Sequence, residues 1–370
     1  MYDGEDNDCD GRVDELVVCA DGTGDERTIS AAAAGAPDGG TIELCPGWYT
    51  EVVTYSDKRL TFVGGGTAPA DVVLDPGEER WLLAVTGEGM GARLEHLAIV
   101  GETVVELGGG ATELIVRDID TCTYGAGTSF GLSAWEDDAT FELSRSRLCD
   151  ASVSLSGDSL GPVASIHENR LSGDSSISYM GEITVRNNVF EGQASMGLYA
   201  SGASPEPGLR VYNNTFVMTG VRAYGLWVDT HGGWDGEIAL YNNIFAGDGA
   251  GFVFAFTRWE SDTRECEELY PSPVAPNIRW GFGAVSATCT RINDYYGYDT
   301  DVFDVSDALD VFTIEDPLLG ARPGRGNFGL LPGSPAVDEG RGEDADGSPA
   351  DLGAFGGANG DWWNEVDWLE

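Results

Sequence analysis

One short unit recurs through the middle of the sequence and limits the chain to a few kinds of fold. Its clear copies are TVRNNVFEG, RVYNNTFVMTG and ALYNNIFAG, and SIHENRLSG is a weaker copy upstream. The apolar residues that end these units follow one another after 23, 19, 26 and 29 residues, at Leu148, Leu171, Phe190, Phe216 and Phe245. Periods of about 20 to 50 residues are typical of repeat proteins, in which each repeat packs on its neighbours.

Each repeat also contains a second apolar stretch, and its copies are GLSAWE, GLYASG, GLWVDT and GFVFAF. Apolar residues alternate in both stretches, and a period of two is typical of β-strands. The sequence therefore predicts an all-β fold, a right-handed parallel β-helix (solenoid) with an N-terminal cap helix and an irregular C-terminal segment. We expect residues 1–18 to form an acidic calcium-loop-like motif, residues 19–335 the capped β-helix, and residues 336–370 a closing segment and tail.

The repeated asparagines have a structural explanation in such a fold. Stacked coils place the same position above itself about every 4.8 Å. Asparagine tolerates a left-handed bend between strands, and its amide can donate a hydrogen bond to the next coil. We predict a ladder of Asn169, Asn188, Asn214 and Asn243. Sugar binding by these amides is the alternative, but repetition at a fixed phase favours the structural role.

Both ends of the repeat region resemble a known superfamily. The stretch TISAAAAG, residues 28–35, predicts a short helix that covers the open end of the core. This helix, PGWYTE and LTFVGGG resemble the start of pectin-lyase-like β-helix proteins, and DPLLG, LLPGSPAVDEG and DLGAFGG resemble the end of bacterial extracellular members. The resemblance spans residues 28–357. It implies the fold but no activity, because this superfamily contains lyases, hydrolases, adhesins and stalks.

Charge narrows the range of partners. The chain has 20 Lys and Arg against 63 Asp and Glu, a formal net charge of -43. A polyanion of this kind repels nucleic acid, anionic lipid and acidic polysaccharide, so we expect a neutral glycan or cell-surface polymer as partner. No apolar run approaches the ~20 residues of a membrane helix, so no membrane insertion is expected. MYDGEDND is not a signal peptide, which predicts either a removed signal or a piece of a longer surface protein.

The N-terminal stretch DGEDNDCDGRVDE matches much of a calcium loop. Alternate carboxylates converge on a hard cation, and a glycine at the sixth position permits the sharp turn. The proposed ligands are Asp6, Asp8, Asp10, the carbonyl of Arg12, and Asp14, with Glu15 replacing the acid that the loop lacks at Val17. The stretch also resembles acidic metal-binding repeats of bacterial surface proteins. We predict calcium rather than copper, because no histidine is near; a solvated acidic tail is the alternative.

Seven cysteines are scattered along the chain without a CxxC pair. This pattern, in an acidic chain with a single lysine, favours an oxidising setting and an extracellular or cell-surface location. Cysteines about one coil apart come within disulfide range when coils stack. We predict the disulfides Cys19–Cys45, Cys122–Cys149 and Cys266–Cys289; Cys9–Cys19 is a competing choice.

The second apolar stretch supplies a candidate glycan-binding face. Tyr199 and Trp227 occupy matched positions in GLYASG and GLWVDT, which predicts outward stacking on consecutive coils. The candidate carbohydrate-binding residues are Tyr199, Trp227, Asp229, His231 and Trp234, and Asp229 and Asp235 are the candidate acid and base of a glycosidase. The alternative is that these aromatic rings only cover the solenoid wall.

Known catalytic sets of β-helix enzymes are missing from the sequence. There is no GHG pattern of polygalacturonases, no DPHE set of alginate epimerases, and only one lysine, Lys58, for a lyase base set. We therefore predict a secreted or cell-surface module that is not an enzyme, a calcium-stiffened structural, adhesive or glycan-contact protein. The alternative is a glycoside hydrolase that acts on a neutral polysaccharide through the Trp227–Asp235 region.

Overall fold

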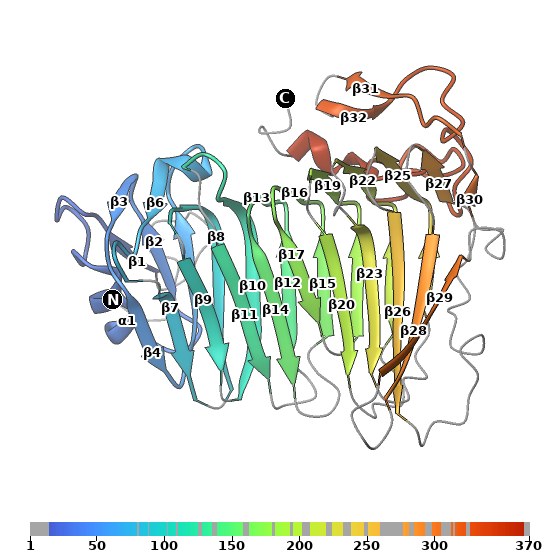
Figure 1. The fold of residues 1–370 in the computed structure, drawn as a ribbon. Helices are drawn as coiled ribbons and strands as arrows, with labels where there is room; N and C mark the ends of the chain where they lie inside the picture. Colours follow the sequence, from blue (N-terminus) through green and yellow to red (C-terminus); the bar gives the residue numbers. More distant parts are fainter. Residues whose placement is uncertain are drawn as a thin grey trace. The chain divides into compact units, whose positions relative to one another are not determined.

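The computed structural model describes residues 15–365, apart from gaps. The gaps fall at residues 80, 88, 102, 109, 125–127, 135–138, 158–162, 180–181, 193–194, 202–207, 220–223, 232–237, 248–250, 260–276, 281–284, 293–297, 305–311, 314 and 323–325. The chain divides into two compact units, Met1–Ala164 (unit 1) and Ser165–Glu370 (unit 2). In each unit most strands pair in parallel with strands of the next coil, as Figure 1 shows, so the predicted all-β parallel solenoid is confirmed.

Unit 1 contains two parallel sheets. The first comprises β1 (Glu15–Val18), β2 (Thr41–Leu44), β3 (Gly47–Tyr49), β5 (Arg59–Gly64), β6 (Val72–Leu74), β8 (Met90–Ile99), β10 (Ala111–Asp120), β12 (Thr140–Ser144) and β13 (Arg147–Cys149). The second comprises β4 (Val53–Ser56), β7 (Trp81–Thr86), β9 (Thr103–Gly108), β11 (Thr128–Ala134) and β14 (Ser152–Gly157). In β2, Ile42 and Leu44 are buried and their neighbours are less so, which is the alternation that a one-sided strand requires.

The predicted cap helix is present as α1 (Ile29–Gly35), and the side chain of Thr28 caps its first turn. Glu51, which follows β3, accepts the backbone N–H groups of Ile29 at 2.7 Å and Ser30 at 2.9 Å. The carboxylate therefore satisfies donors that the helix leaves free at its N-terminus, where negative charge is favoured.

The only lysine of the chain stabilises the other end of α1. The ammonium of Lys58 donates to three carbonyl oxygens at 2.8, 3.1 and 2.8 Å, those of Ala33, Ala34 and Ala36. A positive charge at a helix C-terminus is favourable because the last carbonyls carry partial negative charge. Lys58 thus has a structural role in the cap.

Unit 2 repeats the same two-sheet plan. Its first sheet contains β16 (Arg170–Ser172), β18 (Glu182–Arg186), β19 (Val189–Gly192), β21 (Leu209–Tyr212), β22 (Thr215–Met218), β24 (Ile238–Tyr241), β25 (Asn243–Gly247), β27 (Asn277–Trp280) and β30 (Phe312–Thr313). Its second contains β17 (Ser176–Tyr179), β20 (Ser195–Ser201), β23 (Tyr224–His231), β26 (Gly251–Trp259), β28 (Val285–Ile292) and β29 (Tyr298–Asp304). The strand β15 (Val163–His167) contains the boundary between the units.

The core of unit 2 is a column of aromatic rings at the predicted repeat positions. Phe190, Phe216 and Phe245 are fully buried, and their ring centroids lie 4.5 Å apart in each step. Leu171 pairs with Phe190 at the start of this column. Stacking identical positions in successive coils thus converts a sequence repeat into a continuous apolar core.

The parallel pairing of unit 2 does not continue into every later strand. Strand β29 pairs antiparallel with β28. Beyond the coils, β31 (Leu319–Arg322) and β32 (Gly326–Leu330) form an antiparallel pair, and turns lead to the 3-10 helix η3 (Gly360–Glu365). No helix among the described residues is both long and apolar enough to span a membrane.

Candidate functional site along the asparagine columns

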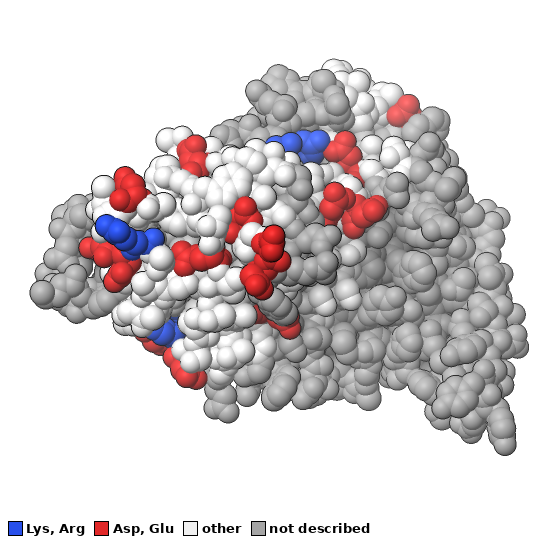
Figure 2. Space-filling view, turned by 60° about the vertical axis from the view of Figure 1, so that its left-hand side comes forward, with Lys and Arg blue, Asp and Glu red and all other residues white. Residues whose placement is uncertain are grey.

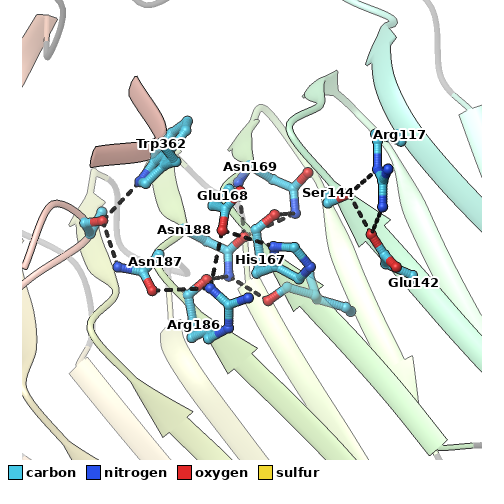
Figure 3. A network of polar contacts seen from close by, with 12 residues as sticks. Arg117, Glu142, Ser144, His167, Glu168, Asn169, Arg186, Asn187, Asn188 and Trp362 are labelled. Carbon is cyan, nitrogen blue, oxygen red and sulfur yellow. Dashed lines mark hydrogen bonds and ion pairs between the residues drawn. The ribbon is translucent and has the colours of Figure 1, made fainter. Parts of the chain in front are cut away.

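The second asparagine of each pair belongs to a buried ladder in unit 2. In each of its four steps, the side-chain amide nitrogen donates to the amide oxygen of the next member at 3.0 Å, and the backbone N–H donates to that same oxygen at 3.0–3.1 Å. The members are Asn169, Asn188, Asn214, Asn243 and Asn277, all of them fully buried. Figure 3 shows the first step, from Asn169 to Asn188. The predicted ladder is therefore present.

The amide nitrogens of the ladder also bind backbone carbonyls. That of Asn214 lies 2.9 Å from the oxygen of Val185 and 3.0 Å from that of Tyr212. Asn188 and Asn243 make the equivalent contacts, each with one carbonyl of its own coil and one of the preceding coil. The ladder amides thus have backbone as well as side-chain partners, and a buried polar group with its partners costs little.

The last ladder member, Asn277, was not among the predicted residues. It follows Asn243 by 34 residues and lies in APNIRW, where no second asparagine precedes it. The feature of the sequence that could have identified it is a single asparagine directly before an apolar strand residue. Asn277 begins β27 and lies opposite Asn243.

The first asparagine of each pair has a different role from the second. Left-handed backbone angles occur at Asn187, Asn213 and Asn242, with φ of 53°, 52° and 57°. In the weaker repeat Glu168 takes this position, with φ of 61°. The prediction that one asparagine makes both the bend and the ladder is wrong. The bend uses the residue that tolerates positive φ, and the ladder uses the next one.

These bend asparagines form a second column that binds the C-terminal segment of unit 2. The amide of Asn187 donates to the carbonyl oxygens of Ala354 at 3.1 Å and Gly356 at 2.9 Å. That of Asn242 donates to the oxygen of Arg341 at 2.9 Å, and the N–H of Arg341 donates back at 2.8 Å. Asn213 contacts the carbonyl of Asp351 at 3.2 Å. The C-terminal segment therefore lies along the side of these coils.

Apolar contacts reinforce this docking. One buried cluster joins Val189 of β19 to the C-terminal segment, and its members there are Phe328, Ala354, Phe355 and Trp362. A second cluster joins Ile244 and Ala246 of β25 to Leu330, Ala336 and Leu352. Gly353 needs to be glycine, because its φ is +93° and an added Cβ would lie 2.7 Å from Ile244.

An acidic pocket of about 350 Å³ lies within the C-terminal segment. Its lining includes Asp338, Asp344, Asp346, Asp351 and Asp361. Burial raises the pKa of Asp344, and the neighbouring carboxylates of Asp351 and Asp346 raise it further, while N–H groups of Gly357 and Asp351 oppose the shift. Among the described residues, no three His, Cys, Asp or Glu side chains are placed to hold a metal ion.

Two of the predicted disulfides are present in unit 1. Cys19 pairs with Cys45 and Cys122 with Cys149, each with 5.0 Å between the Cα atoms. Cys122 follows β10 and Cys149 ends β13, so the second disulfide joins neighbouring coils. Cys9 and Cys266 lie outside the described residues, and the backbone of Cys289 lies in β28.

The predicted aromatic pair of the second sheet is out of register. Tyr199 lies opposite Asp229, and Trp227 lies opposite Gly197. The two aromatic residues therefore do not occupy matched positions on consecutive coils, and the prediction that they do is wrong. His231 lies opposite Ser201.

The remaining predicted site residues fall largely beyond what the structure covers. Trp234 and Asp235 lie outside the described residues, so the Asp229–Asp235 acid–base pair stays a prediction. The predicted calcium ligands Asp6, Asp8, Asp10, Arg12 and Asp14 also lie outside them. Glu15 begins β1 opposite Thr41, so the last four residues of the predicted 1–18 motif are part of the first sheet.

Comparisons with known proteins add little, so the fold assignment rests on the observed strand pairing. No protein-family model matches the chain, and no curated protein does. Among solved structures it is similar to Escherichia coli YbhC, with 13% identity, coverage of 71% of this chain and 75% of that chain, and a TM-score of 0.29. At that TM-score the likeness carries no weight for activity.

Proposed function

We propose that the chain is a secreted or cell-surface β-solenoid module of the pectin-lyase-like kind, with a structural, adhesive and glycan-contact role rather than a catalytic one. The observation that carries the proposal is the pair of disulfides Cys19–Cys45 and Cys122–Cys149. Structural disulfides persist in oxidising compartments and are rare in the cytosol. The buried ladder and the docked C-terminal segment add a second support, since both stiffen the coils of unit 2.

The net charge of -43 agrees with this role. A strongly acidic surface keeps a long module soluble and repels anionic polymers, which leaves neutral glycans as the better partners. Asp229 and Tyr199 at neighbouring register positions are candidate contacts for such a glycan.

Antibody labelling of intact cells tests the location directly. An antibody raised against the purified chain should detect it on unpermeabilised cells or in the culture medium, with a cytosolic protein as negative control. Labelling that appears only after permeabilisation, with none in the medium, would rule out a secreted or surface module.

Calcium binding at the N-terminus is a separate part of the proposal. Titration calorimetry should detect one Ca²⁺ per chain, because alternate carboxylates at Asp6, Asp8 and Asp10 have the spacing of a calcium loop. The double variant Asp8→Ala/Asp10→Ala should lose this binding, while Asp21→Ala, an acidic residue outside the loop, should keep it. An unchanged heat signal in the double variant would remove calcium from the account.

A further inference from the structure

Two exposed aromatic rings meet on the surface of unit 1. Among the described residues, five large apolar side chains are exposed, and the only aromatic ones are Trp48, 46% exposed, and Tyr124, 40% exposed. Their ring centroids lie 5.3 Å apart at an interplanar angle of 73°. Single exposed apolar residues need no explanation, but the two exposed aromatics of this set touching each other form a surface feature.

Hydrogen bonds fix the orientation of the Trp48 ring. Its indole N–H donates to a carboxylate oxygen of Asp75 at 3.2 Å, and the other oxygen of Asp75 accepts the N–H of Gly77 at 2.8 Å. The next residue, Tyr49, is buried, and its hydroxyl lies 2.8 Å from the carbonyl oxygens of both Val18 and Cys45. The ring of Trp48 is therefore bound to Asp75, and strand β3 is anchored by Tyr49, the residue that follows it.

Hydrogen bonds and a disulfide also constrain the turn that contains Tyr124. The carboxylate of Asp120 accepts the N–H groups of Cys122 at 2.7 Å and Thr123 at 3.1 Å. The disulfide to Cys149 fixes Cys122, two residues before the ring. A binding surface whose side chains are already ordered loses little entropy when a ligand arrives.

We infer that Trp48 and Tyr124 form a binding subsite for the ring of a neutral saccharide. An exposed indole and a phenol ring offer apolar surface to the C–H groups of a sugar. Acceptors for sugar hydroxyls border both rings: the carboxylate of Asp75 binds the indole of Trp48, and Tyr124 contacts the carbonyl of Ala70 at 3.4 Å.

Charge selects a neutral saccharide over an acidic one. Figure 2 shows acidic side chains spread over the described surface of the visible face, with few basic ones among them. A uronate or sulfated sugar on these rings would also lie beside the carboxylate of Asp75, which contacts Trp48, and would be repelled. The inference rests on the proposed glycan contact but names a different place for it, in unit 1 rather than at Tyr199 and Asp229.

Affinity electrophoresis of the full chain tests the subsite. Native gels containing β-glucan, glucomannan, galactomannan or hydroxyethylcellulose should retard the wild-type chain in at least one case. Trp48→Ala and Tyr124→Ala should each weaken retardation about ten-fold or more, as expected for a central aromatic contact. Tyr124→Phe, which keeps the ring, should retain binding, and the melting temperature of the two alanine variants should stay near that of wild type.

The outcomes separate this inference from the wider proposal. Retardation that survives both alanine variants but is lost in Tyr199→Ala would overturn the subsite and leave a glycan-contact module standing. No retardation in any neutral gel would overturn the subsite, while antibody labelling still decides the extracellular location. An oligomer in size-exclusion chromatography that Trp48→Ala dissociates would show that a second copy covers the rings, and would also overturn it.

Discussion

Asn214→Ala should lower the free energy of unfolding by about 3 kcal/mol or more, because its neighbours lose buried partners at about 1–3 kcal/mol each. The amide oxygen of Asn214 accepts two hydrogen bonds from Asn188, one from the backbone N–H and one from the side chain. Its amide nitrogen donates to the side-chain oxygen of Asn243. Alanine removes these side-chain hydrogen bonds in the middle of the ladder, where every member is fully buried.

Asn213→Gly is the matched control for this variant. Glycine adopts the left-handed backbone of Asn213, φ 52°, without strain, so only the side-chain contacts to Asp351 and Asn242 are lost. Chemical denaturation should therefore show a smaller loss for Asn213→Gly than for Asn214→Ala. Equal losses would mean that the ladder and the bend do not contribute separately to stability. An unchanged denaturation midpoint for Asn214→Ala would contradict the buried ladder.

Removal of the Cys122–Cys149 disulfide should have an effect of similar size. The two cysteines are 27 residues apart. In the chain-entropy model a loop of this length gives about 3–4 kcal/mol of stabilisation. The double variant Cys122→Ser/Cys149→Ser should therefore unfold at lower denaturant concentration than wild type.

Reduction provides the control for the double variant. Dithiothreitol should destabilise the wild-type chain more than the variant, because the variant has only Cys19–Cys45 left to lose among the disulfides of the described residues. If the reductant destabilises both proteins equally, the Cys122–Cys149 bond contributes nothing to stability.

The architecture of the first sheet in unit 2 could be predicted because a polar residue recurs at the same position of each coil. A buried asparagine must sit at one position per coil, so the repeated pair gives both the period and the register of β19, β22 and β25. The ladder residues Asn188, Asn214 and Asn243 follow from that recurrence. Asn277 does not, because the long interval before it contains no copy of the pair.

The second sheet has no such recurring polar residue, and its predicted register differs from the observed register by two residues. Aligning GLYASG with GLWVDT by their Gly-Leu pairs matches Tyr199 with Trp227, whereas the strands place Tyr199 opposite Asp229. A shift of two residues keeps every side chain on its own face, so the apolar pattern cannot distinguish the two alignments. An irregularity between Tyr224 and Trp227 disturbs the register further.

Long-range docking also leaves little trace in the sequence. Asn187 reaches the carbonyls of Ala354 and Gly356, 167 and 169 residues later. Because the acceptors are backbone oxygens, any residue type could provide them, and no pattern identifies the partner. Trp48 and Tyr124 did have a signal, since each follows a disulfide cysteine within three residues, but only the fold brings them together.

Peptide mapping under non-reducing conditions tests the central claim most directly. The chain is taken from its native cells, its free thiols are alkylated at once, and the peptides are identified by mass. An extracellular solenoid stapled between coils predicts linked peptides for Cys19–Cys45 and Cys122–Cys149, which dithiothreitol separates. Recovery of all four cysteines as alkylated free thiols would contradict the claim.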